Sequence, residues 1–296
     1  MPAAITSKTA RSLTSALVAA CVICWFAPLG AGASDAPDPT EAVLRVGTYV
    51  EQYYARAQSI VARESVILQP LQNDFGMAGF ARRLEYELRV EWNPDAPPDQ
   101  RATVVRELVS AKGPPLGPPK QPDCMDPRSV SPEPLAFLLP DQRQKFAYKL
   151  GGSARVNGRA ATIIEYKPTF KEPPRVNWND ECGTIDMPGR TAGRIWADAE
   201  TSEILRYDEF LIGWTDIPGP KDKRRYGSAD WFTVERADTS IRYKPVTFRD
   251  PEETLLLPSE ITSFTVIRNS GIPRLRSTQT FSNYRRYVTG GRLVVQ

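Results

Sequence analysis

The stretch GRIWADAETSEILRYD, residues 193–208, carries the pattern that decides the fold of this chain. Apolar and polar residues alternate on both sides of the polar run 199–202, which is typical of two antiparallel strands joined by a tight turn. With that turn, we expect Trp196 to lie opposite Leu205. Such a wall either carries catalytic groups or shelters something apolar, and the rest of the sequence bears on that choice.

The same period of two is clearest in RRLEYELRVEW, residues 82–92. Here Leu84, Tyr86, Leu88 and Val90 alternate with charged residues, which predicts a strand with one apolar and one charged face. The pair Asn-Gly at 157–158 favours a tight hairpin. Further strands are expected at 59–69, 101–111, 144–156, 159–167, 229–236, 239–248, 259–269 and 274–287.

One helix is expected ahead of these strands. Asp38 is placed to cap it, Pro39 suits its first position, and Glu41 completes a capping-box pattern. Apolar residues then recur every three or four positions, at Val43, Val46, Val50, Tyr53 and Ala57.

The 27 prolines among 296 residues disfavour long helices elsewhere, and only a short helical turn is expected, around 134–139. The predicted fold is therefore mainly β (α+β). It is a large curved antiparallel sheet or open half-barrel with an N-terminal amphipathic helix, formed by residues 34–296 as one domain.

The first 33 residues predict export. Lys8 and Arg11 precede a mostly apolar run, and small residues at 31–33 are of the kind that a signal peptidase accepts. Polar residues interrupt the run before it reaches the ~20 apolar residues needed to span a bilayer. We expect cleavage near Ala33, a periplasmic location and a mature protein that is peripheral at most to the membrane. Lipidation at Cys21 stays open as an alternative.

Two cysteines remain once the leader is removed, Cys124 and Cys182. An oxidising compartment favours a disulfide between them. Both lie in stretches that look irregular, QPDCMDP and NDECGTID. We therefore expect a staple between two loops, which stabilises by about 4 kcal/mol in the chain-entropy model.

The charge balance and the residue inventory exclude several classes of function. The 38 basic and 35 acidic residues leave no surplus of positive charge for nucleic acid. The chain contains no histidine, the commonest general base and metal ligand. It also lacks the sequence motifs of nucleophilic hydrolases, phosphate loops and dinucleotide sites. We therefore expect no catalytic residue, no metal and no cofactor.

A pair of carboxylates is the remaining route to catalysis, because glycoside cleavage needs only two acids at the right separation. The candidates are Glu87, Glu165, Asp198 and Asp208. Cross-strand ion pairs with arginines are the commoner role of such residues. Acids dispersed over the solvated face of the sheet would remove the hydrolase alternative.

The order of elements resembles the LolA/LolB-like lipoprotein-carrier superfamily. The resemblance rests on the helix, the long charged strand, the Asn-Gly hairpin, the 193–208 hairpin, VTFRDPEETLLLPSEI at 246–261 and SNYRRY at 282–287. It covers roughly residues 38–287. It implies an unclosed antiparallel barrel, capped by helices, whose inner face shelters acyl chains; the superfamily also includes envelope-stress sensors.

The leading prediction is an exported, non-catalytic protein that holds a lipid, acyl chain or other apolar ligand, because one helix covers only part of so large a sheet. Its partner would be a lipid or a lipidated protein. The alternative is an interaction or sensor module with a filled cavity that binds an envelope protein. The residues expected to line the cavity, or else to form plain core, are Leu84, Tyr86, Leu88, Val90, Trp196, Leu205, Phe264 and Val266. Tryptophans near turns mark either a partner surface or loop packing: Trp92, Trp178, Trp214 and Trp231.

Overall fold

A computed structural model describes residues 38–286 apart from 58–59, 94, 98–101, 128–133, 180–181, 221–229 and 250–251; of 90–92, 102 and 103 it describes the backbone alone. The expected leader, with Cys21 and Ala33, lies outside the described residues. The elements are α1 (Thr40–Ala57), β1 (Ile60–Pro70), β2 (Arg82–Trp92), β3 (Ala102–Lys112), η1 (Leu135–Leu138), η2 (Arg143–Lys145), β4 (Phe146–Val156), β5 (Arg159–Pro168), β6 (Arg175–Asn179), β7 (Cys182–Asp186), β8 (Thr191–Asp198), β9 (Ile204–Leu211), β10 (Thr215–Pro218), β11 (Trp231–Arg249), β12 (Glu252–Arg268) and β13 (Arg274–Arg286).

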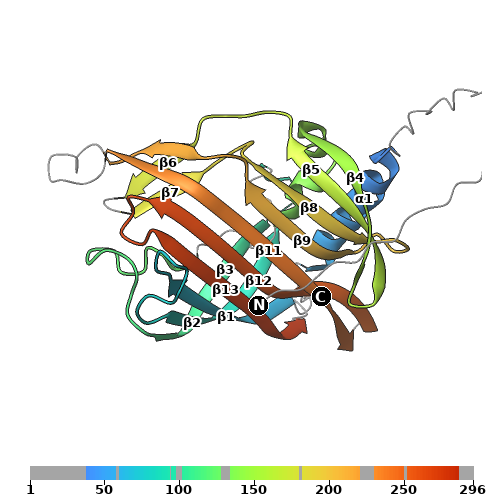
Figure 1. The fold of residues 1–296 in the computed structure, drawn as a ribbon. Coiled ribbons are helices and arrows are strands. Elements are labelled where there is room, and N and C mark those ends of the chain that lie inside the picture. The colour runs from blue at the N-terminus through green and yellow to red at the C-terminus, as the bar shows by residue number, and fades with distance from the viewer. Residues whose placement is uncertain are drawn as a thin grey trace, which may run out of the picture. The chain divides into compact units, whose positions relative to one another are not determined.

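The main sheet has 11 antiparallel strands in the order β3-β2-β1-β13-β12-β11-β9-β8-β5-β4, with β10 paired to β11 (Figure 1). β3 and β4 stand at its two edges and do not pair with each other, so the sheet is open. The prediction of a mainly β fold with a large open antiparallel sheet and an N-terminal helix is confirmed. The Asn157-Gly158 turn is also confirmed, since both residues have positive φ.

Two strands expected at 229–236 and 239–248 are one continuous strand, β11. Ala237 and Asp238, where the break was expected, pair with Thr265 and Phe264 of β12. Because these residues are small or polar, apolar alternation does not predict a strand here. Their backbone is nevertheless paired with the long strand β12. The hairpin β6–β7, within the stretch read as irregular, was also missed.

The register of the 193–208 hairpin differs from the expected one. Ala197 pairs with Ile204, but Trp196 pairs with Arg206, because a β-bulge leaves Leu205 as an additional residue between them. The expected pairing of Trp196 with Leu205 is therefore wrong. The bulge places Arg206 opposite Trp196, and its guanidinium lies 4.5 Å from the centre of the indole ring.

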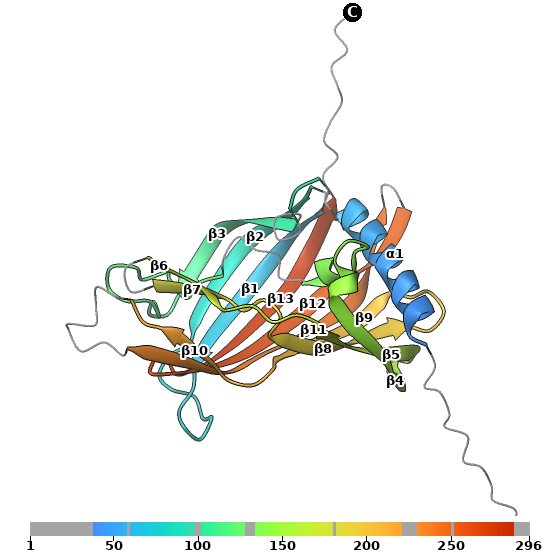
Figure 2. The ribbon, with the colours of Figure 1, turned by 90° about the horizontal axis from the view of Figure 1, so that it is seen from above.

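α1 packs on one side of the sheet, which we call the inner face (Figure 2). Asp38 caps the helix by accepting a hydrogen bond from the Thr40 amide at 2.9 Å, whereas Glu41 pairs with Arg45 instead of completing a capping box. The expected apolar stripe of α1 is buried. It joins one core cluster with η1 and residues of the sheet, among them Leu88, Ile164, Ile195, Tyr207, Ile241 and Phe281.

η1 comes close to the middle of α1 because Gly47 has no side chain. A Cβ at this position would lie 2.8 Å from the carbonyl oxygen of Leu138. Leu135 and Leu138 are both buried in the first cluster. The helical turn expected around 134–139 therefore exists and helps to cover the inner face.

A second, smaller apolar cluster lies at the other end of the inner face. It contains Val66 and Leu68 of β1 with Leu84 and Tyr86 of β2. The segment 113–127, which we call the strap, packs Leu116 and Met125 against it.

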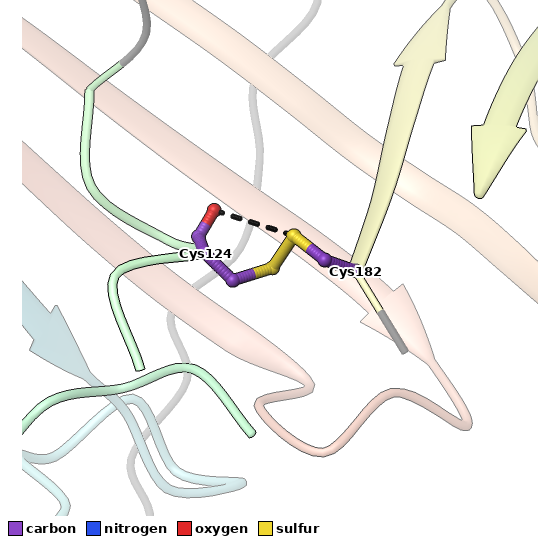
Figure 3. Close-up of a disulfide and its surroundings, with 2 residues drawn as sticks. All are labelled: Cys124 and Cys182. Atoms are coloured by element: carbon purple, nitrogen blue, oxygen red, sulfur yellow. Dashed lines mark hydrogen bonds between the residues drawn. A yellow bond between two sulfur atoms is a disulfide. The ribbon is translucent and has the colours of Figure 1, made fainter. Parts of the chain in front are cut away.

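The expected disulfide joins Cys124 of the strap to Cys182, whose Cα atoms lie 5.9 Å apart (Figure 3). Cys182 begins strand β7 and is not in an irregular loop, so the staple ties the strap to a small hairpin.

Removing the staple should loosen the strap. The Cys124→Ser/Cys182→Ser variant is expected to lose about 2–4 kcal/mol of unfolding free energy, because the denatured chain regains the freedom that the cross-link removes. Guanidinium denaturation followed by circular dichroism measures this loss, and reduced wild type should match the variant. Equal midpoints for oxidised wild type and variant would contradict the prediction.

Candidate ligand-binding face

A small apolar cavity lies between the C-terminal half of α1 and the sheet. Its volume is about 30 Å³, and its lining is Tyr53, Tyr54, Ala57, Ile60, Ala62, Leu88, Leu257, Pro258, Phe281 and Tyr284. Such a volume holds about one or two water molecules. Side chains of α1 and the sheet therefore nearly fill the space beside the C-terminal half of the helix in this conformation.

The inner face also carries a buried ion pair. Glu64 of β1 and Arg106 of β3 meet with Oε2 and Nε 2.7 Å apart, and their side chains are 0% and 5% exposed. Glu64 lies directly opposite Phe281 of the first cluster and Tyr86 of the second. The pair therefore stands between the two apolar clusters.

A second buried arginine ties the strap to the sheet. Arg82 of β2 donates to both carboxylate oxygens of Asp126, at 2.7 and 2.6 Å, and to Asp123 at 2.7 Å. Burial raises the pKa of nearby Tyr86 to about 12, and the charges of Asp126 and Glu64 add to the rise. The Tyr86 hydroxyl therefore stays protonated at neutral pH.

Two tyrosines and a glutamate form a third polar group on the inner face. The hydroxyls of Tyr166 and Tyr207 lie 2.5 Å apart, and both donate to Glu209. Burial and the Glu209 charge hold the pKa of both tyrosines above the ordinary value. Their protonated hydroxyls satisfy a carboxylate at the margin of the first cluster.

Small polar side chains separate the two apolar clusters. Along β13, Gln279 and Ser277 lie between Phe281 of the first cluster and Leu275, which packs on the second. Ser263 and Thr239 continue this band on β12 and β11, with hydroxyls 3.3 Å apart. The Gln279 Oε1 atom is buried without a hydrogen-bond partner among the described residues. The inner face is thus apolar at both ends and polar between them.

The predicted cavity residues do not come together in one place. Leu84 and Tyr86 lie in the second cluster, and Leu88 and Leu205 in the first. Among those whose side chains the structure describes, Leu88 alone lines the cavity beside α1. The side chain of Val90 lies outside the described part of the chain.

Of the three remaining residues, Trp196 is half-buried and packs against the first cluster, whereas Phe264 and Val266 lie on the outer face. Phe264 pairs with Asp238, while its neighbour Thr265 shares the inner side with Leu275. The Phe264 ring contacts Phe75, with centroids 5.7 Å apart. Apolar character alone does not say which side of a strand a residue occupies, so it did not separate Phe264 and Val266 from the inward residues.

Sequence reasoning also missed the polar residues of the inner face. Glu64 lies two positions from Val66, and Glu209 two positions from Tyr207, so each has the parity of inward apolar neighbours. A charged residue at an inward position was the available signal. Charged residues on a strand usually face solvent, so their parity alone does not place them on the inner face.

The four carboxylates considered for acid–base work are all engaged in ion pairs. The pairs are Asp198 with Arg159, Glu165 with Arg194 and Lys149, Asp208 with Arg206, and Glu87 with Arg285. They are dispersed over the outer face and the β8–β9 turn. These four acids therefore do not form the pair across a cleft that the hydrolase alternative requires.

No group of three or more acidic or cysteine residues in the described part of the chain is arranged to hold a metal ion. Among the described helices, none combines the length and the apolar character needed to cross a membrane.

Comparison with known proteins finds similarity among solved structures. No protein-family profile and no curated protein matches the chain. The chain is similar to a DUF1329 family protein from Desulfovibrio piger, with 11% identity over 86% of this chain and 95% of that one and a TM-score of 0.41. It is also similar to a LolA superfamily protein from Nitrosomonas europaea, with 8% identity over 84% and 94% and a TM-score of 0.35. The second of these structures belongs to the superfamily that the sequence resembles.

Neutralising the buried carboxylate tests the ion pair. Glu64→Gln should cost about 3–5 kcal/mol of unfolding free energy, because it leaves the Arg106 charge buried without its counter-ion. The control Glu85→Gln, whose side chain is 53% exposed beside Arg63, should cost less than about 1 kcal/mol. Urea denaturation measures both, and equal costs would contradict the prediction.

The hairpin turn should make stability depend on pH. Burial opposes ionisation of Asp198, but the Thr201 and Glu200 amides and the Arg159 guanidinium outweigh it and hold its pKa below the ordinary value. The ionised form therefore stabilises the fold above the unfolded pKa of about 3.9, and this contribution is lost as pH falls through the lower folded pKa. Asp198→Asn should destabilise at pH near 7, and its deficit should shrink below pH about 4. A deficit that is constant across this range in thermal unfolding would count against the assignment.

Proposed function

We propose that this chain is an exported binding protein that holds an acyl chain or similar apolar ligand on the inner face, in the place that α1 occupies in the closed form. The observation that carries the proposal is the cavity at the seam between α1 and the sheet, whose lining is entirely apolar or aromatic apart from tyrosine hydroxyls. Ligand sites usually measure about 300–1,000 Å³. A cavity of about 30 Å³ is too small for an acyl chain, so it marks the point where the ligand begins to enter. α1 must then move away from the sheet for the rest of the acyl chain to bind.

The energetics of α1 permit this exchange. The helix buries a stripe of apolar side chains on the sheet, and apolar contact is not directional. An acyl chain that covered the same floor would regain about 25 cal/mol for each Å² that the helix gives up. An ion pair between Arg56 of α1 and Glu253 of β12, 3.1 Å apart, holds the helix end in the closed form.

Other features support a non-catalytic role in an oxidising compartment. The Cys124–Cys182 disulfide suits an exported protein, and the leader pattern predicts export. The candidate acids are engaged in ion pairs.

A second candidate is an envelope interaction module that binds another protein. The small volume beside α1 favours it, because a permanently filled interior needs no ligand. Pull-down from envelope extracts with and without mild detergent distinguishes a protein partner from a lipid.

The decisive experiment measures the lipid that co-purifies with the protein and the affinity of the protein for an added fatty acid. Organic extraction of the purified mature chain, followed by mass spectrometry, should release a lipid, and a fluorescent fatty acid should bind. Ala62→Val adds two methyl-sized groups to the cavity wall and so stabilises the closed form, by about 0.8 kcal/mol for each carbon. We therefore expect a higher melting temperature and about tenfold weaker probe binding.

The matched control is Ala111→Val, the same change at an exposed position of β3. It should leave probe affinity unchanged. A chain that releases no lipid and binds no probe would overturn the proposal and leave the interaction module. Equal affinity for Ala62→Val and Ala111→Val would show that the seam beside α1 is not the entry site.

A further inference from the structure

Large apolar side chains are exposed on loops at one end of the strands, where β1 turns into β2 and β12 turns into β13. In the β1–β2 loop, Phe80, Met77 and Phe75 are 82%, 73% and 52% exposed. In the β9–β10 loop and at the start of β11, Trp214 and Trp231 are 70% and 55% exposed. We call these five residues the aromatic rim. A contiguous group of exposed apolar residues marks an interaction surface.

Contacts join the β1–β2 loop to the β12–β13 end of the sheet. The Arg274 guanidinium of β13 donates to Asn73 at 2.6 Å, and the Leu71 amide donates to the Arg274 carbonyl at 3.0 Å. Figure 2 shows the β1–β2 loop projecting beyond the sheet, beside the ends of β12 and β13.

The β9–β10 loop and the start of β11 lie at the same end of the strands. The Asn269 side chain, in the β12–β13 loop, donates to the Trp231 carbonyl at 3.1 Å. The Arg268 guanidinium lies 5.7 Å from the centre of the Trp214 ring. The five apolar side chains therefore belong to one group of neighbouring loops at the same end of the strands, although these loops are distant in sequence.

Basic side chains border the rim. They are Arg83 at the start of β2, Lys112 at the end of β3, and Arg274 and Arg276 on β13, and none of the four has an ion-pair partner among the described residues. Arg83 and Lys112 are direct cross-strand partners. Like charges in that position repel each other, so an anionic surface opposite them would relieve an unfavourable contact.

We infer that the aromatic rim docks on the surface of an anionic phospholipid bilayer. Tryptophan and phenylalanine side chains suit the interface between head groups and acyl chains. Lysine and arginine side chains near the rim are attracted to an anionic leaflet. Separate apolar tips on projecting loops fit a fluid surface better than the flat, packed core of a protein interface. The rim lies outside the inner face, so this inference goes beyond the proposed ligand site.

Vesicle flotation tests the inference. The mature chain should float with vesicles of equal parts phosphatidylglycerol and phosphatidylcholine, float less with phosphatidylcholine alone, and lose binding as salt rises. The rim variant Met77→Ser/Phe80→Ser/Trp214→Ser should bind anionic vesicles at least about tenfold more weakly, because three interfacial side chains are lost. Arg274→Gln/Arg276→Gln should weaken binding and reduce its salt dependence.

The control is Val105→Ser/Leu108→Ser/Val109→Ser, which removes three exposed apolar side chains from the edge strand β3. It should float like wild type. Absence of flotation with either vesicle, equal binding to neutral vesicles, or equal losses in rim and control variants would each overturn the inference. The rim variant should keep its affinity for the soluble fatty-acid probe, which separates surface docking from binding on the inner face.

Discussion

An open antiparallel sheet must hide the apolar side of its strands, and the rest of this structure follows from how that side is covered. α1 and η1 cover one end of the inner face, and the strap with its disulfide covers the other. Between them lie the Glu64–Arg106 pair and a band of small polar residues, which need no apolar cover. The cover at the α1 end is an amphipathic helix held largely by apolar packing, and such packing can be exchanged for a ligand of similar character.

The two ends are tied down differently. The strap is fixed by a covalent bond and by the paired carboxylates of Asp123 and Asp126 on Arg82. α1 is fixed by packing and by an ion pair in which Arg56 is 39% exposed, and such a pair contributes little stability. Opening of the inner face is therefore expected at α1, while the strap stays in place. The aromatic rim lies on loops at one end of the strands. Docking of this end on a bilayer would leave the inner face free to exchange its contents.

Much of the fold was predictable from the sequence because its signals are local. The period of α1, the alternation in β2 and the Asn157-Gly158 turn each involve a few neighbouring residues. The pairing between strands is less local, since the bulge at Leu205 places Arg206, not Leu205, opposite Trp196. The middle of β11 was missed because its small and polar residues are held in a strand by pairing with β12, which is distant in sequence. The short hairpin β6–β7 was missed because a disulfide to the distant strap holds it. At the inner face, Leu88 and the disulfide were predictable, and the inward parity of Glu64 and Glu209 was visible, but the pairing of Glu64 with Arg106 was not, because Arg106 comes from a distant strand.

We propose that an apolar ligand takes the place of α1 on the inner face. Hydrogen exchange of the mature chain, measured with and without a saturating fatty acid, tests this most directly. The account predicts that backbone amides of α1 exchange faster in the presence of the fatty acid, while those of β1, β12 and β13 remain protected. If the fatty acid binds and the α1 amides keep their protection or gain more, the ligand lies elsewhere and the account is wrong.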